Sequence, residues 1–498
     1  RDNNIMQFFS SSSVNDDDDF TATPAPPGTA LVFTLRAMDR SETVGKPGRP
    51  SNAYITVDPT PPQQVDFSSA ILMPEATTTN PWLVYGVDRA WTDTPVLVLL
   101  ELPPDDKAKC YASDAFLDRS VRARVQVGSR VAVVALATVE ASISEKESRE
   151  LLGDDGARLS WVGNTGRCGS TLMHKLLLSA GVLSLTEPQW VDQLCKGTAY
   201  QKATDAQLER SVQACIALDA YFATKSLECF TGVSDDNDAK ERIVSINPKS
   251  GGARVQAAVA RAFPKARHLF MYRKCEKVVE SFGAIFLKDH PPSWTTPYAW
   301  ALNVFVFGPP PVPEPIEKVP GLRDALGTLS SPLAARGVAG WLLAVLGYCD
   351  VVRPALLETS SSEAVVVRMD EFVAPATRAD VAKRVLAHLK VVAYDEDTVL
   401  AVFGKDSQEG SKMSRMGDPS KQKVTLLTDA DRDVIRSTCL KLAFKDKMVS
   451  ASMNGEKEAS TTESTSTPNG GETAPLVVHF DAASGDVILA GTAGWKAP

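Results

Sequence analysis

The sequence lacks several patterns that would define a class of protein at once. Its eight cysteines are scattered and form no Cys-x-x-Cys pair, which argues against a zinc or disulfide framework and is typical of a reducing compartment. No apolar run reaches the roughly 18 residues of a membrane span, so no transmembrane segment is expected. The five histidines are isolated, so we expect no metal site.

The chain also lacks an excess of basic residues. Its formal net charge is −8 at pH 7, which argues against nucleic acid or an anionic membrane as the main partner. No Asn-x-Ser/Thr glycosylation sequence occurs. Together with the cysteine pattern, this favours the cytoplasm. Hydrophobic residues make up 44% of the 498 residues, which is enough for a sizeable core and for about two to four domains.

The first 150 residues divide into a polar segment and a β-rich module. Residues 1–27 combine an acidic run with prolines, and we expect them to be disordered. Residues 28–150 contain short apolar runs separated by Pro, Gly, Asp and Asn, which predicts an all-β sandwich-like module. The predicted strands are Ala30–Leu35, Ala53–Val57, Trp82–Val87, Val96–Leu102, Val121–Val127 and Arg130–Ala137. Nothing in this module points to chemistry.

From residue 155 to 449 the pattern changes to alternating strands and helices. The predicted strands are Leu159–Val162, Val182–Leu185, Ile243–Ile246, His268–Tyr272 and Ala364–Val367. The predicted helices are Ser170–Ala180, Ala206–Ala223, Ala253–Ala262, Glu276–Ile285 and Ala379–Leu389, with a last one starting near Thr428. This alternation predicts an α/β domain, a three-layer, mostly parallel sheet with helices on both faces.

Three further segments are predicted from composition. The Pro-rich residues 308–320 indicate an excursion loop, and residues 450–474 a low-complexity linker. Residues 475–498 hold two short β-like runs, Leu476–Phe480 and Asp486–Leu489. These runs are expected to form a hairpin or to dock on the N-terminal β module.

The segment 159–173 carries the strongest chemical signal. An apolar strand leads into a glycine-containing turn and then a helix, an arrangement whose backbone N–H groups and helix dipole can bind an anion. Gly166 and Gly169 allow close approach of a phosphate, and Ser170 and Thr171 supply hydroxyl donors. Asn164 and Ser170 replace the first glycine and the lysine of a Walker A loop. A glycine-rich turn without a ligand is the alternative.

Residues Thr165-Gly166-Arg167-Cys168-Gly169-Ser170-Thr171 resemble the 5′-phosphosulfate loop of sulfotransferases, especially its arginine-containing form in tyrosylprotein and related sulfotransferases. The resemblance implies a P-loop-type fold over residues 155–449 and 3′-phosphoadenosine 5′-phosphosulfate (PAPS) as co-substrate, without a metal. It further implies that these seven residues bind the donor and that Arg167 takes part in catalysis. A cysteine at a helix N-terminus would in principle have a lowered thiol pKa, although we expect Cys168 to be a small loop residue.

A second motif lies about a hundred residues further on. The predicted strand His268–Tyr272 ends at Arg273, and Ser281 follows eight residues later on a helix. A strand-end arginine and a serine two turns along the next helix can hold one phosphate. The same spacing in sulfotransferases binds the 3′-phosphate of the donor. The segment Phe263–Arg267 before the strand also resembles the family sequence.

Two more residues are candidates for catalysis. Glu187 follows Arg167 by 20 residues at the end of a short strand, and a glutamate at nearly this spacing is the general base in tyrosylprotein sulfotransferases. Lys249 follows another strand, where many sulfotransferases carry a lysine that neutralises charge. The histidine of the small-molecule sulfotransferases is missing here, which favours Glu187 as the base.

Late in the domain, Lys412 and Arg415 lie where the family has a basic loop over the nucleotide, and they are candidates for the 3′-phosphate. Asp370 follows the strand Ala364–Val367 and resembles the acid of a Walker B strand. It provides the main argument for a P-loop NTPase or kinase that uses Mg-ATP.

The sequence therefore predicts an enzyme that transfers a sulfuryl group from PAPS to a hydroxyl or amine. A P-loop NTPase and a non-catalytic nucleotide-fold binding module are the alternatives. The acceptor, a small molecule, a glycan or a peptide, is not specified, and neither is the oligomeric state. Several sulfotransferases act in the Golgi lumen, so that compartment is the alternative to the cytoplasm.

Overall fold

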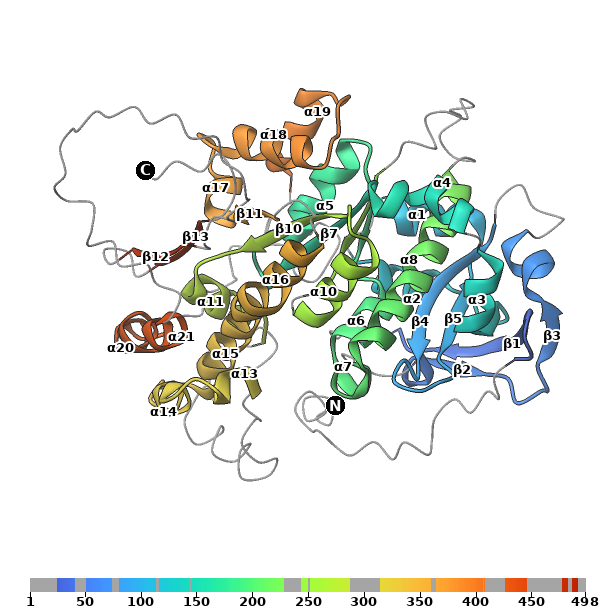
Figure 1. The fold of residues 1–498 in the computed structure, drawn as a ribbon, viewed down its shortest axis with the longest axis horizontal. Helices are drawn as coiled ribbons and strands as arrows, with labels where there is room; N and C mark the ends of the chain where they lie inside the picture. Colours follow the sequence, from blue (N-terminus) through green and yellow to red (C-terminus); the bar gives the residue numbers. More distant parts are fainter. Residues whose placement is uncertain are drawn as a thin grey trace.

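The computed structural model contains two large sheets that lie side by side (Figure 1), and a separate two-stranded sheet near the C-terminus. It describes residues 25–40, 51–73, 80–112, 116–143, 145–227, 243–249, 251–286, 314–359, 364–405, 407, 426–445, 477–481 and 486–490. Of the segment predicted as disordered, residues 1–24 lie outside these residues, as does the predicted linker 450–474; residues 25–27 are ordered, with Ala25 buried.

The N-terminal sheet is antiparallel, with the strand order β2-β1-β6-β5-β4 and with β3 also paired to β1. Its strands are β1 (Thr29–Met38), β2 (Ile55–Val57), β3 (Gln63–Asp66), β4 (Trp82–Asp88), β5 (Val96–Glu101) and β6 (Arg130–Ala135). Four helices accompany it: α1 (Pro104–Ala112), α2 (Leu117–Arg124), α3 (Leu136–Ser142) and α4 (Glu145–Leu152). The module is therefore a single sheet with helices, and the all-β sandwich prediction was wrong.

The predicted strand Val121–Val127 illustrates the cause of this error. Leu117, Val121 and Val125 are spaced one helical turn apart and all three are buried, so the segment has a helical face. Asp118 and Arg122 pair at the same spacing, with Arg122 Nε 3.1 Å from Asp118 Oδ1. The spacing of four residues therefore favours the helix α2, although Val121 and Val125 are β-branched.

The second sheet is parallel, with the order β11-β10-β7-β9-β8. Its strands are β7 (Leu159–Asn164), β8 (Leu183–Thr186), β9 (Val244–Asn247), β10 (Arg267–Tyr272) and β11 (Val365–Arg368). All five predicted strands are confirmed. From β7 the chain first builds β8 and β9 on one side and then β10 and β11 on the other. The strand order thus reverses at β7, and ligands of parallel α/β sheets bind at such a reversal, beyond the strand ends.

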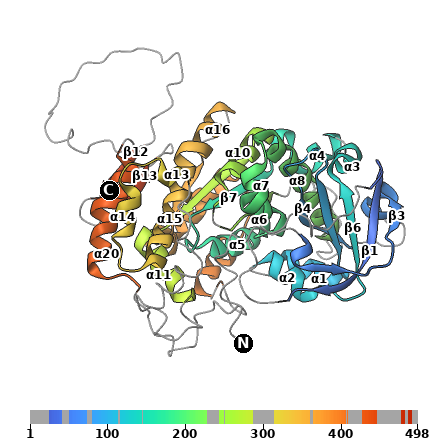
Figure 2. The same ribbon diagram turned by 90° about the horizontal axis from the view of Figure 1, so that it is seen from below.

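Helices cover both faces of the parallel sheet, as predicted; Figure 2 shows α5 and α10 on opposite sides of β7. Val162, Leu269 and Met271 pack toward one face, whereas Trp161 and Phe270 pack toward the other. The first face is covered by α5 (Ser170–Ser179), α17 (Met369–Val373), α18 (Arg378–His388) and α19 (Glu396–Ala401). The second is covered by α8 (Asp205–Leu227), α10 (Ala253–Ala262), α11 (Cys275–Phe286) and α15 (Pro332–Gly347).

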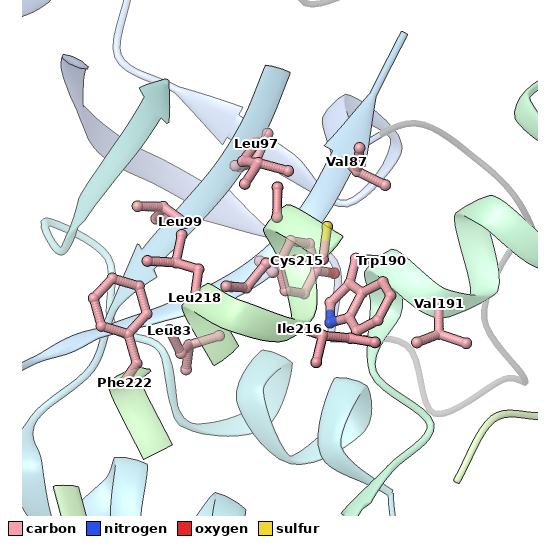
Figure 3. Close-up of a cluster of buried hydrophobic side chains, with 14 of the residues drawn as sticks. Leu83, Val87, Leu97, Leu99, Trp190, Val191, Cys215, Ile216, Leu218 and Phe222 are labelled. Atoms are coloured by element: carbon pink, nitrogen blue, oxygen red, sulfur yellow. The ribbon is translucent and has the colours of Figure 1, made fainter. Parts of the chain in front are cut away.

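The two sheets share one hydrophobic core. Figure 3 shows side chains of β4 and β5 meeting those of α8 and of α6 (Gln189–Cys195). Among them, Leu83 and Leu99 come from the antiparallel sheet, and Trp190, Ile216 and Phe222 come from the helices. The boundary between the two predicted modules therefore lies between the two sheets, but side chains from both modules pack in the same hydrophobic cluster.

Residues 314–358 form helices that the sequence analysis did not predict: α13 (Glu314–Glu317), α14 (Leu322–Gly327), α15 and α16 (Arg353–Glu358). The part of the predicted excursion loop from 314 to 317 is thus helical, and 308–313 lies outside the described residues. Within the described part of the chain, one helical run, Pro332–Glu358, is long and apolar enough to span a membrane. However, 56% of its most apolar window is buried inside the protein.

The C-terminal elements agree with two of the predictions. Helix α20 (Asp429–Val434) begins at Thr428, whose side chain and backbone form a capping box with Asp431, and α21 (Lys441–Phe444) follows. Strands β12 (Val477–Asp481) and β13 (Asp486–Ala490) form the predicted antiparallel pair. Val487 and Leu489 pack in the cluster of α11 and α15, so this pair docks beside the parallel sheet and not on the N-terminal module.

Candidate functional site at the reversal of strand order

The turn between β7 and α5 has an unusual backbone. Gly166, Arg167 and Gly169 have φ angles of 72°, 53° and 86°. Left-handed conformation is easy for glycine but costs other residues roughly 1–2 kcal/mol. Strain of this kind is concentrated at functional sites. Backbone N–H groups of a turn that leads into a helix can point toward a common anion, and the helix dipole favours its charge.

Side chains tie this turn to the end of the neighbouring strand β9. Asn164 Nδ2 donates to the Pro248 carbonyl (2.8 Å), and Asn164 Oδ1 accepts from Gly166 N (2.9 Å). Asn247 Nδ2 donates to the Ser170 carbonyl at 2.9 Å. Asn164, which in the sequence was only a departure from the Walker A pattern, therefore shapes the turn.

These contacts divide the predicted donor-binding residues into two groups. The Thr165 amide donates to the Met271 carbonyl at 3.1 Å, and the Gly166 amide is used by Asn164. Both amides hold the turn in place and do not face a ligand. The amides of Gly169 and Ser170, at the start of α5, remain the better anion donors, together with the half-buried Ser170 hydroxyl. The Thr171 side chain is mostly buried.

Cys168 lies beneath the turn. Its side chain is fully buried among residues such as Val162 and Met173. Burial raises the pKa of the thiol to about 11, so the lowering suggested by the helix N-terminus is outweighed by desolvation. Cys168 is a packing residue, and only its backbone can take part in anion binding.

The second predicted motif lies directly beside this turn. Arg273 follows β10, and its Nη1 is 3.5 Å from the Arg167 carbonyl. Arg167 Nε donates to Ser281 Oγ on α11 at 2.9 Å. Trp341 Nε1 donates to the Arg273 carbonyl at 2.8 Å and fixes the strand end. The structure thus brings together Arg167, Arg273 and Ser281 at the reversal of strand order.

Glu187 and Lys249 form the other side of the site. Glu187 ends β8 with a φ of 52°, and its amide donates to the Asn247 carbonyl at 2.7 Å. Burial raises the pKa of Glu187 to about 7, against the opposing attraction of Lys249. Burial also opposes the charge of Lys249, but the carboxylates of Asp192 and Glu187 outweigh it and hold the pKa of Lys249 above its usual value.

The remaining predicted residues are Lys412, Arg415 and Asp370. Lys412 and Arg415 lie outside the described residues. Asp370 is half-buried at the start of α17, and its Oδ2 is 3.9 Å from Arg368 Nη2. It follows the edge strand β11, which is separated from β7 by β10. The strands adjacent to β7 are followed by Lys249 and Arg273, so neither offers an acid for a magnesium ion.

Sequence reasoning missed two charged pairs. Lys196, which directly follows α6, has its Nζ 3.0 Å from Asp192 Oδ1. On α2, Asp118 and Arg122 pair in the interior. Both pairs have the i, i+4 spacing that could have marked them. Their nearness to the site depends on the contact between the two sheets, which no local pattern encodes.

No protein-family model matches the chain, and no curated protein is significantly similar to it. The functional assignment therefore depends on the motifs and on the geometry of this chain.

Proposed function

We propose that the protein transfers a sulfuryl group from PAPS to a hydroxyl or amine acceptor. The supporting observation is the convergence of the Gly166–Gly169 turn with Arg273 and Ser281 at the strand reversal. PAPS carries phosphates at both the 5′ and the 3′ position of one ribose, so a protein that binds it needs two neighbouring anion sites. A nucleoside triphosphate has no 3′-phosphate and leaves the second site unexplained.

In this proposal, each residue near the turn has a defined role. The Gly169 and Ser170 amides and the Ser170 hydroxyl hold the 5′-phosphosulfate, while Arg273 and Ser281 hold the 3′-phosphate. Arg167 and Lys249 offset the negative charge that develops on the leaving phosphate oxygen.

The reaction forms a bond between the acceptor oxygen or nitrogen and sulfur and breaks the bond from sulfur to the bridging oxygen. Adenosine 3′,5′-bisphosphate leaves with the electron pair, and the acceptor proton passes to Glu187. A carboxyl with a pKa of about 7 suits this role, because it is largely ionised just above neutral pH and still basic. Catalysis comes mainly from positioning and preorganised charge.

The test measures release of adenosine bisphosphate from PAPS in the presence of EDTA, with phenols, sugars and tyrosyl peptides as acceptors. We expect acceptor-dependent release that Arg167→Ala lowers by about a hundredfold to a thousandfold. Arg323→Ala is the matched control, because the side chain of Arg323 is 69% exposed on the surface.

Two outcomes would contradict the proposal. Hydrolysis of ATP that requires magnesium would favour the NTPase alternative with Asp370. Binding of the bisphosphate without turnover on any acceptor would favour the non-catalytic binding module.

A further inference from the structure

A second acid, Asp192, lies beside the proposed catalytic pair. It sits on α6, and its side chain is 2% exposed. Each of its carboxylate oxygens faces a lysine. Lys196 Nζ is 3.0 Å from Oδ1, and Lys249 Nζ is 3.9 Å from Oδ2. A buried carboxylate needs such partners, because taking its charge out of water is costly.

The antiparallel sheet fixes the helix that carries Asp192. Next to Asp192, Gln193 Oε1 accepts from the Val87 amide at 2.8 Å, and its Nε2 donates to Asp88 Oδ1 at 3.2 Å. Gly86 makes this contact possible, since a Cβ there would lie 2.9 Å from Gln193 Oε1 and 2.2 Å from Ser51 Oγ. The N-terminal module therefore determines where α6 lies relative to β9.

The position of Lys249 depends on which carboxylate holds it. Among the described residues, its ion pair within 4.0 Å is with Asp192 and not with Glu187. A direct pair with Glu187 would stabilise the ionised carboxylate and make it a poor base. The charged and titratable groups around Glu187 and Lys249 are Asp192 on α6, Lys196 directly after it, Asp118 on α2 and Tyr54 before β2. Arg122 pairs with Asp118 and lies near Tyr54.

We propose that Asp192 is a positioning residue of the sulfuryl-transfer site, which holds Lys249 next to Glu187 without pairing the two. The antiparallel sheet serves this role by fixing α6 through Gln193. The inference rests on the proposed function for its consequence in catalysis. The placement of Lys249 by Asp192 is independent of it.

The first test requires no donor. In the full-length chain, acetic anhydride labels unprotonated amines, and mass spectrometry reports the labelling of Lys249 as a function of pH. Asp192→Asn removes an anion and is expected to shift this labelling to lower pH. Lys196→Gln removes a competing cation and is expected to shift it to higher pH. Asp205→Asn is the matched control, because that side chain is 58% exposed.

The second test measures the pH dependence of bisphosphate release from PAPS. Asp192→Asn should lower kcat by up to about a hundredfold, since misplacement of a reacting group carries such a cost. It should also move the acidic limb of the pH profile to lower pH, because Asp192 raises the pKa of Glu187. Affinity for adenosine 3′,5′-bisphosphate should stay unchanged, and Asp192→Glu should restore part of kcat.

Labelling of Lys249 that is the same in the wild type, Asp192→Asn and Lys196→Gln would overturn the inference. Opposite shifts in the two variants support it even if one of them is less stable. A wild-type protein that neither binds the bisphosphate nor consumes PAPS would refute the proposed function, while the labelling result would still decide the role of Asp192.

Discussion

Arg167 Nε lies 2.9 Å from Ser281 Oγ, although 114 residues separate them in the chain. The first residue belongs to the turn after β7 and the second to the helix after β10, and these two strands are neighbours. Sequence analysis assigned them to different phosphates of one donor. Their contact shows that the two predicted anion sites are adjacent. In the proposed function, binding of the donor exchanges this hydrogen bond for contacts with its phosphates.

Removal of the Arg167 guanidinium is the first prediction. Arg167→Ala should lower kcat by about a hundredfold to a thousandfold, equal to roughly 3–4 kcal/mol, as for the loss of one preorganised donor to a developing oxyanion. Steady-state release of bisphosphate from PAPS checks this. A variant with the wild-type kcat would rule out the catalytic role of Arg167.

The second prediction concerns the proposed 3′-phosphate site and its selectivity between two nucleotides. Arg273→Gln should weaken binding of adenosine 3′,5′-bisphosphate by about tenfold to a hundredfold, since a hydrogen bond to a charged group contributes roughly 1.5–3 kcal/mol. Binding of adenosine 5′-monophosphate should change little. Titration calorimetry with both nucleotides measures the ratio. Equal losses for the two ligands would mean that Arg273 does not read the 3′-phosphate.

Glu187 makes a prediction about stability as well as activity. Its pKa rises from 4.5 to about 7 on folding, so the folded state keeps a proton that the unfolded state loses first. Stability therefore falls as the pH rises from 4.5 through 7, by roughly 3 kcal/mol in total. Glu187→Gln should remove this loss and be more stable than the wild type at pH 8.

Urea denaturation of the two proteins at pH 4.5 and pH 8 tests this prediction. The free energy of unfolding of Glu187→Gln should exceed that of the wild type by more at pH 8 than at pH 4.5. The activity of the wild type should increase with pH through about 7. A variant that is equally destabilised at both pH values would contradict the assignment of a half-buried carboxyl with a raised pKa.

The close packing of Gly163 against Gln256 gives a further prediction, which a second substitution can check. A Cβ at Gly163 would lie 2.2 Å from Gln256 Oε1 on α10, and Gln256 is buried. Gly163→Ala should cost about 1–3 kcal/mol of stability, as for overpacking in a core. The cost should be smaller in a Gln256→Ala background, as a double-mutant cycle would show. Equal costs in both backgrounds would mean that another contact limits the space.

The parallel domain could be predicted because its local patterns agree with the fold. Its strands are short, largely apolar segments, and Thr428 with Asp431 forms the capping box that the sequence indicates. The sandwich prediction failed because Leu117, Val121 and Val125 are β-branched or apolar residues whose helical spacing was overlooked. Apolar runs of this length do not distinguish a strand from a buried helix.

The candidate site could be predicted in part. The spacing of Arg273 and Ser281 marked one anion site, and the turn marked the other. Asp192 could not be assigned, because its nearness to Lys249 depends on how α6 packs against β4. The role of Asn164 was also missed, since a side chain that caps a turn cannot be distinguished in the sequence from one that faces solvent.

The most direct test of two adjacent anion sites is a calorimetric titration of the full chain with adenosine 3′,5′-bisphosphate in EDTA. We expect one site per chain, with an affinity that falls in both Arg167→Ala and Arg273→Gln and remains in Arg323→Ala. Absence of binding in EDTA, with binding of ATP that requires magnesium, would contradict the assignment.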